Sequence, residues 1–194
     1  MTLKQTPSQT AGPFFHYMLT PEQSGYPYSS LVGPDLTKGE NEAAIPGERI
    51  RVEGRITDGQ GQPMSDALIE IWQADAQGRY SHPADKRSSN APFTGFGRTA
   101  SDAEGRFVFD TIKPGAIGDG QAPHLTLVMF TRGGQNHLYT RIYFSDEAGA
   151  NAKDPVLTVV PEDRRATLIA ERRGRAYHHD IRVQGDGETV FFDV

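Results

Sequence analysis

Tyrosine, histidine and arginine side chains are candidates for carrying chemistry, and the sequence contains no cysteine. Disulfides, thiolate nucleophiles and zinc knuckles are therefore excluded, and any metal would need oxygen and nitrogen ligands, which favours hard ions. Tyr80 and His124 are among the tyrosines and histidines that carry such donor atoms. The two residues could be residual metal ligands, parts of a degenerate pocket or ordinary packing residues. A histidine on a strand is usually structural, which favours ordinary packing.

A second histidine pattern, His178-His179 beside Asp180, resembles a metal or proton-relay cluster. Adjacent residues of a strand point to opposite faces, so the two imidazoles are not expected to bind one ion. Both are therefore predicted to be structural.

Arg132 is a candidate for binding a carboxylate, because a guanidinium group is a planar fork that matches the two oxygens. A surface ion pair of little energetic value is the alternative. Far upstream, Gly12 and Pro13 precede an aromatic cluster, and glycine lets a backbone approach a ligand closely. An ordinary turn is the alternative there.

Composition excludes several classes of function. The chain has 194 residues and a net charge of −5, with its basic residues spread along the sequence, so no nucleic-acid partner is expected. No apolar stretch is long enough to span a bilayer, and the first twelve residues lack the apolar region of a secretory signal. We expect a cytoplasmic protein with no membrane partner.

Short strands dominate the elements that must position these residues. Alternating apolar and polar residues predict a strand over residues 49–56. Similar patterns predict strands at 67–73, 97–99, 106–109, 124–131 and 138–144, and a hairpin formed by 180–184 and 189–193. One helix is predicted from Pro161 to about Arg172, because proline takes its first position and acids follow in the first turn.

These elements predict an all-β fold, an antiparallel β-sandwich with long loops and one short helix. Residues 1–45 are rich in Pro, Gly, Ser and Thr and carry two aromatic clusters. They are expected to form an N-terminal arm that packs on a partner chain. Residues 46–194 are expected to form the sandwich domain.

An ordered series of short motifs extends through the middle of the chain. The motifs are Ile71-Trp72-Gln73-Ala74-Asp75, Gly78-Arg79-Tyr80, Phe96-Gly97-Arg98-Thr99, Asp102-Ala103-Glu104-Gly105, Thr111-Ile112-Lys113-Pro114-Gly115 and Ala122-Pro123-His124-Leu125-Thr126. Each motif alone is weak, but their order and spacing resemble the intradiol ring-cleaving dioxygenases over nearly the whole chain. In the catalytic chains of that family, two tyrosinates and two histidines hold a mononuclear Fe(III) ion.

The resemblance places Tyr80 and His124 at the positions of the first tyrosine and the first histidine. Ile117 takes the place of the second tyrosine, and Thr126 takes the place of the second histidine. Ile117 has no donor atom, and a threonine hydroxyl is a poor ligand for ferric iron. The resemblance therefore implies four vestigial metal positions, with no catalytic residue and no bound cofactor in this chain.

Residues 6–13, 151–153 and 187–193 are similar to the α-type, iron-free chains of two-chain members of the family. This similarity implies a homologous iron-binding β subunit as partner in an (αβ)n oligomer, with Fe(III) in the partner. It also implies protocatechuate (3,4-dihydroxybenzoate) as the aromatic substrate, cleaved by O₂ to 3-carboxy-cis,cis-muconate. Thr10, Gly12, Pro13 and Arg132 would then line the substrate pocket.

Two alternatives follow from the same residues. Tyr139 or Tyr143 could complete a ferric site within this chain, which would make it a self-sufficient dioxygenase. The chain could instead be a structural or binding module with no contact to substrate.

Overall fold

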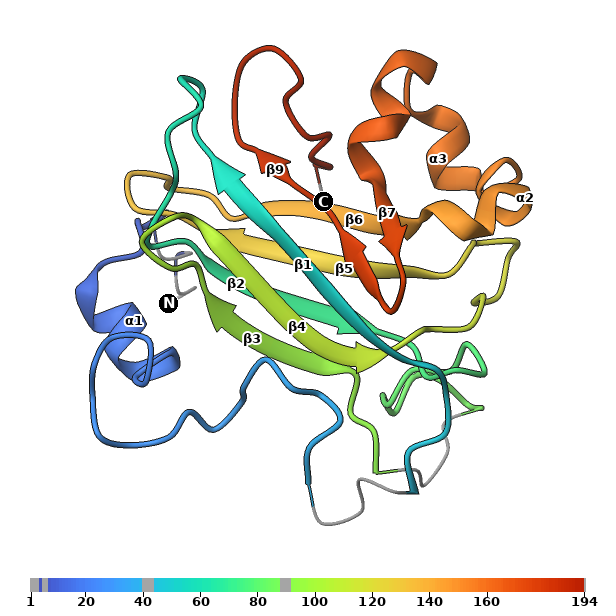
Figure 1. Ribbon diagram of the computed structural model, residues 1–194, viewed down its shortest axis with the longest axis horizontal. Helices are drawn as coiled ribbons and strands as arrows, with labels where there is room; N and C mark the ends of the chain where they lie inside the picture. Colours follow the sequence, from blue (N-terminus) through green and yellow to red (C-terminus); the bar gives the residue numbers. More distant parts are fainter. Residues whose placement is uncertain (1–3, 5–6, 40–43, 88–91, 194) are drawn as a thin grey trace.

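The computed structural model describes residue 4 and residues 7–39, 44–87 and 92–193. Nine strands make up most of the regular structure (Figure 1). They are β1 (Arg49–Thr57), β2 (Leu68–Gln73), β3 (Phe96–Ala100), β4 (Arg106–Ile112), β5 (His124–Phe130), β6 (Leu138–Phe144), β7 (Ile169–Arg173), β8 (Ala176–His178) and β9 (Ile181–Arg182). The helices are short: α1 (Pro13–Leu19), α2 (Ala148–Asn151) and α3 (Pro155–Val159), with the 3₁₀ segments η2 (Ser145–Glu147) and η3 (Glu162–Leu168).

The strands form one continuous sheet in the order β3-β2-β5-β6-β7-β8-β1-β4, and β9 pairs with β1. The sheet curls, so that β1 and β4 lie over β2 and β5 (Figure 1). The expected β-rich fold with little helix is confirmed, but the expectation of a purely antiparallel sandwich needs correction. Three pairings are parallel, namely β6–β7, β1–β8 and β1–β9, and β7 and β8 connect the two halves of the sheet.

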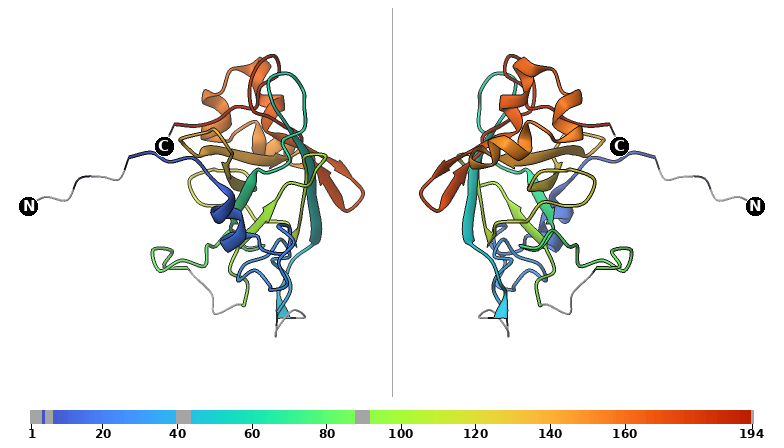
Figure 2. Two further views of the ribbon diagram at one scale, coloured as in Figure 1. Left: turned by 90° about the vertical axis from the view of Figure 1, so that its left-hand side faces the viewer. Right: turned by 90° about the vertical axis from the view of Figure 1, so that its right-hand side faces the viewer.

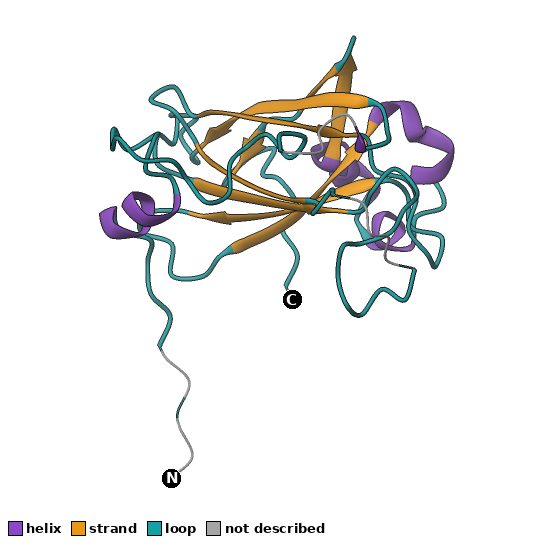
Figure 3. Ribbon diagram, turned by 90° about the horizontal axis from the view of Figure 1, so that it is seen from below, coloured by secondary structure: helices purple, strands orange, loops and turns teal. Residues whose placement is uncertain are grey.

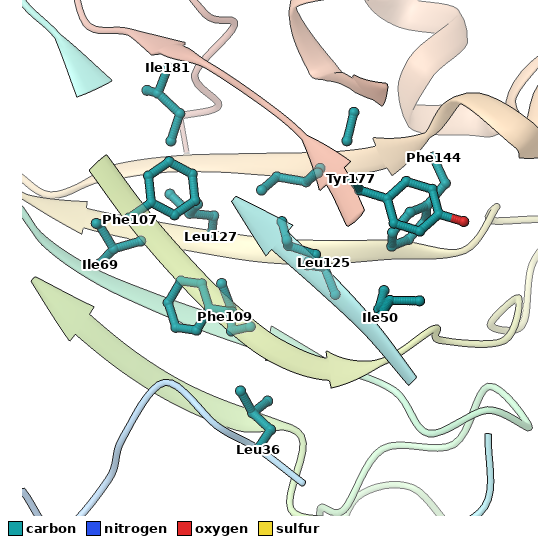
Figure 4. Close-up of a cluster of buried hydrophobic side chains, with 14 of the residues drawn as sticks. Leu36, Ile50, Ile69, Phe107, Phe109, Leu125, Leu127, Phe144, Tyr177 and Ile181 are labelled. Carbon is teal, nitrogen blue, oxygen red and sulfur yellow. The ribbon is translucent and has the colours of Figure 1, made fainter. Parts of the chain in front are cut away.

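The core fills the space inside this curl. In β1 the alternation of the sequence is matched by the alternation of burial, with Ile50, Val52 and Ile56 facing inward. Figure 4 shows Phe107 and Phe109 of one half opposite Leu125 and Leu127 of the other. Each such side chain stabilises the fold by roughly 1.5–3 kcal/mol when fully buried. Because the core lies on the inner face of the sheet, the outer face of β2, β5 and β6 can carry other residues.

The helix predicted from Pro161 to Arg172 is wrong. Residues Glu162–Leu168 form the 3₁₀ segment η3, and the chain continues directly into strand β7. The backbone of β7 pairs with Tyr143–Phe144 on one side and with β8 on the other. These tertiary pairings outweigh the local helical signals, which are worth only tenths of a kcal/mol per residue.

The predicted C-terminal hairpin is also wrong. Strand β9 pairs in parallel with Ile56–Thr57 of β1. Residues 189–192 instead turn toward β6, where Phe192 forms a bridge with Tyr139 and the Thr140 hydroxyl donates to the Val190 carbonyl at 2.7 Å. The Gly185-Asp186-Gly187 turn therefore links two parts of the fold rather than two strands of a ribbon.

The N-terminal segment passes close to the sheet before β1 begins. Residues 7–12 approach the body of the fold from outside and lead into α1 (Figure 2), which lies at the opposite side from α2 and α3 (Figure 3). Phe15 packs against Phe130 at the end of β5, with ring centroids 5.3 Å apart. Further along, Asp35 bridges to Asp110 and Leu36 enters the core. Among the described residues, no helix has the length and apolar character needed to cross a membrane.

Candidate functional site

The loop that carries Tyr80 is held by Asp75, a buried residue at the end of β2. One carboxylate oxygen of Asp75 accepts the backbone N–H groups of Gln77 and Arg79, at 2.9 and 3.0 Å. The other oxygen accepts from Nε of Arg79 at 2.9 Å. Asp75 therefore both caps the turn and pairs with a basic neighbour, and Tyr80 emerges from a rigid loop.

The Pro114-Gly115 turn packs directly on this loop. Gly78 has a φ of +72°, and a Cβ atom there would lie 1.9 Å from the carbonyl oxygen of Ala116. Gly115 is equally tight, since its Cβ would lie 2.5 Å from the carbonyl oxygen of Ala76. Only glycines allow the two loops to approach so closely. This contact brings the segment that contains Ile117 against the segment that precedes Tyr80.

Replacing Gly78 with alanine is expected to destabilise the fold by about 2 kcal/mol or more, because it combines a left-handed backbone with a backbone clash. Chemical denaturation of the purified protein measures this change. Gly118→Ala is the matched control in the neighbouring loop, since nothing lies within 4 Å of a Cβ at Gly118. Equal stability of the two variants would contradict the packing described here.

The outer face of β2, β5 and β6 carries His124 and Thr126, two of the four positions that the sequence predicts to be vestigial metal positions. Thr126 lies on β5 between Trp72 of β2 and Arg141 of β6, which are its register partners on either side. Two residues earlier, His124 starts β5 on the same face. Tyr80 stacks on Trp72 with ring centroids 6.2 Å apart and an interplanar angle of 7°.

A hollow of about 530 Å³ opens beside Tyr80 and is lined by Trp72, Tyr80, His82, Ala84 and Asp85. The fold therefore gathers Tyr80, His124 and Thr126 on one face of the sheet, and the loop with Ile117 packs beside the Tyr80 loop.

Arg141 is the residue of this site that the sequence did not single out. Its Nη1 donates to Oε1 of Gln121 at 2.8 Å and to the hydroxyl of Tyr143 at 3.2 Å. The Tyr143 hydroxyl in turn donates to the fully buried Asp154 at 3.2 Å. The positive charge of Arg141 acts to lower the pKa of both Tyr80 and His124. A guanidinium group therefore lies close enough to act electrostatically on both Tyr80 and His124.

These residues do not fit a ferric ion. Burial raises the pKa of Tyr80, which favours the neutral phenol over the tyrosinate that Fe(III) would need. His124 Nδ1 lies 2.8 Å from the carbonyl oxygen of Ala122, so only its Nε2 could serve as a ligand. The remaining two positions offer an isoleucine and a threonine. No group of three or more His, Asp or Glu side chains in the described ranges is placed to hold a metal.

The two tyrosines considered as replacement ligands have other partners. The Tyr143 hydroxyl is shared between Arg141 and Asp154, and burial raises its pKa strongly. Tyr139 pairs in register with Val128, one step further along the face from Thr126, and its ring packs edge-on against Phe192. Neither arrangement favours a self-sufficient ferric site.

The burial of His124 and His179 predicts that the fold loses stability in acid. Burial lowers the pKa of each to about 4, below the ordinary value near 6.5 in an unfolded chain. The unfolded chain therefore takes up protons first, so the stabilisation is complete above pH 6.5 and is lost as the pH falls toward 4. Each residue contributes on the order of 3 kcal/mol to that loss.

Unfolding free energies measured between pH 7 and 4 check this prediction. His124→Asn, which keeps a donor for the Ala122 carbonyl, is expected to remove about half of the histidine-dependent loss. His137→Gln is the matched control, because His137 is exposed. A His124→Asn variant with an unchanged pH dependence would refute the assignment.

The residues expected at a substrate pocket form a second group, at the N-terminal end of the fold. The backbone N–H of Gly133 donates to the Thr10 hydroxyl at 2.8 Å, so the arm reaches the turn that carries Arg132. Gly12 caps α1 and Pro13 is its first residue. A Cβ atom at Gly12 would meet nothing within 4 Å, so this chain itself does not require glycine there.

His178 and His179, the histidine pair near the C-terminus, differ in burial, as strand geometry predicts. His179 is buried, whereas His178 is half-buried and lies 3.1 Å from Asp180. The two side chains do not share a site.

Comparison with known proteins places this architecture in a family. A dioxygenase family model matches residues 26–185. The chain is 47% identical to the protocatechuate 3,4-dioxygenase alpha chain of Burkholderia cepacia, covering 100% of this chain and 99% of that one. It is 44% identical to the alpha chain of Pseudomonas putida, covering 98% and 97%. It is 37% identical to the Burkholderia cepacia beta chain, covering 80% and 73%.

Solved structures show the same fold. An intradiol ring-cleavage dioxygenase from Tetranychus urticae superposes with a TM-score of 0.63 at 19% identity, over 80% of this chain and 89% of that one. The family model and the full-length relatives agree with this likeness. The chain therefore belongs to the intradiol ring-cleavage dioxygenase family.

Proposed function

We propose that this chain is the iron-free α subunit of a protocatechuate 3,4-dioxygenase and works with a homologous iron-bearing β subunit. One observation carries the proposal: two of the four positions expected to match the family's iron ligands are Ile117 and Thr126, and Arg141 lies in register with Thr126. The full-length similarity to two protocatechuate 3,4-dioxygenase alpha chains supports the substrate class. The similarity to a beta chain supports a common origin of the two subunits.

Ring cleavage is assigned to the ferric site of the partner, and no step of it to this chain. The proposed contribution of this chain is to complete the walls of the partner's pocket and to bind the carboxylate of the substrate. Arg132 suits that role because its side chain is 65% exposed and carries a permanent charge. Gly12 suits the role because its open Cβ direction leaves room for a close neighbour.

The surface around α1 supports a partner at this end of the molecule. Phe14 and Met18 of α1 are 82% and 76% exposed, and Tyr28 and Leu31 are exposed nearby in the sequence. Tyr17, Tyr26 and Tyr28 pack in series with tilted rings, whose centroids are 4.9 and 5.6 Å apart. An apolar group of this kind next to Thr10 and Arg132 favours burial against another chain.

The test is to purify the chain alone and after co-expression with a homologous chain that has two tyrosines and two histidines at the ligand positions. The proposal expects a colourless, iron-free chain alone. It expects a coloured complex of both chains that cleaves 3,4-dihydroxybenzoate. Stoichiometric iron and visible absorbance in the chain alone would overturn it, as would full activity of the partner without this chain.

A further inference from the structure

Arg132 does not project freely from its turn. Its Nε lies 2.8 Å from Oδ2 of Asp66, which sits in the connection between β1 and β2. The carboxylate is partly buried, with 30% of its side chain exposed, whereas the guanidinium side chain is 65% exposed. The more buried carboxylate therefore contacts the more exposed guanidinium group.

This ion pair leaves the far end of the guanidinium available. A guanidinium group has two edges that can bind a carboxylate with two hydrogen bonds, one that includes Nε and one formed by the two Nη atoms. Asp66 lies at Nε, and no other side chain in the described part of the molecule pairs with Arg132. The edge formed by the two Nη atoms remains open.

Two residues of the N-terminal segment, His16 and Thr10, lie near this pair. His16 of α1 is 8% exposed, and its Nε2 is buried without a hydrogen-bond partner. It lies near enough to the pair that Asp66 raises and Arg132 lowers its pKa, while burial, the largest effect, lowers it. On the other side, the Thr10 hydroxyl holds the backbone of Gly133. The turn and the ion pair are thus bounded by the arm.

We propose that Asp66 is a positioning residue that holds Arg132 at Nε and so presents the Nη edge to the carboxylate of an aromatic acid. This inference rests on the proposed function, because the acid is bound in the pocket shared with the partner subunit. It makes Asp66 a determinant of specificity for carboxylated catechols over catechol itself. A restrained arginine loses less conformational freedom on binding than a free one.

The test compares KM and kcat of the two-chain complex for 3,4-dihydroxybenzoate and for catechol. Asp66→Asn, which keeps the shape and removes the charge, is expected to raise KM for the carboxylated substrate about three- to tenfold. It is expected to leave kcat and the KM for catechol unchanged. Asp66→Glu should recover part of the loss. Asp110→Asn is the matched control, since it breaks the similarly exposed Arg51–Asp110 pair at 2.8 Å.

A double-mutant cycle distinguishes a result that contradicts only this inference from a result that also contradicts the proposed function. In an Arg132→Ala background, Asp66→Asn should have no further effect on KM, because its action passes through Arg132. An increase in KM with Arg132→Ala but not with Asp66→Asn would overturn this inference alone. No effect of Arg132→Ala in an assembled complex would overturn both this inference and the substrate contact in the proposed function. An equal rise in KM for both substrates would show that Asp66 is merely structural.

Discussion

Replacing Arg132 with alanine is expected to raise the KM of the two-chain complex for 3,4-dihydroxybenzoate tenfold or more. A charge-assisted contact to a carboxylate is worth about 1.5–3 kcal/mol, and 1.4 kcal/mol corresponds to a factor of ten. The loss is expected chiefly in KM, since the contact is made in the bound substrate as well as in the transition state. Arg132→Lys should fall between wild type and alanine, because it keeps the charge but loses the fork.

Steady-state kinetics with the carboxylated substrate and with catechol measure this effect. Catechol has no carboxylate, so its KM should be unaffected by the substitution. Arg51→Ala is the matched control, because Arg51 is another exposed arginine paired with an aspartate at 2.8 Å. An assembled Arg132→Ala complex with wild-type kinetics would instead favour a structural module that does not touch the substrate.

The strands were predicted well from the sequence because apolar and polar residues alternate along them, and this signal is local. The predicted strands at 49–56 and 138–144 correspond to β1 and β6 within one residue. The helices were predicted poorly, although two of them carry clear start signals. Pro13 is the first residue of α1, and Asp154 caps α3 by accepting the N–H groups of Val156 and Leu157. Both helices are so short that no periodic pattern develops within them.

The candidate site was predicted only where a strand or a motif fixes it. Strand parity placed His124 and Thr126 on one face, and the structure shows them there. Arg141 was missed because its position opposite Thr126 depends on the register of β5 with β6, which local sequence does not determine. The pairing of Arg132 with Asp66 joins residues 66 positions apart, so it too arises from tertiary structure alone.

Arg141 also explains why restoring the missing donors would not suffice to restore a metal site. Its guanidinium is fixed by Gln121 and Tyr143 and acts electrostatically on Tyr80 and His124. Two like unit charges 4 Å apart repel by about 4 kcal/mol at the effective dielectric constant near 20 that describes protein sites. A trivalent ion multiplies that repulsion. The positive charge of Arg141 therefore opposes the binding of iron at the positions predicted to be vestigial.

Iron binding by this chain is accordingly expected only when Ile117→Tyr, Thr126→His and Arg141→Gln are combined. The triple variant should bind close to one iron per chain and gain visible absorbance from tyrosinate bound to iron, whereas the variant with Ile117→Tyr and Thr126→His alone should bind little. Metal analysis and absorbance spectra of the two variants measure the difference. Adding Tyr80→Phe to the triple variant should weaken the colour, because one tyrosinate is lost. Full iron content in the double variant would show that Arg141 is no obstacle, and only the residues at positions 117 and 126 would then support the proposal that this chain binds no iron.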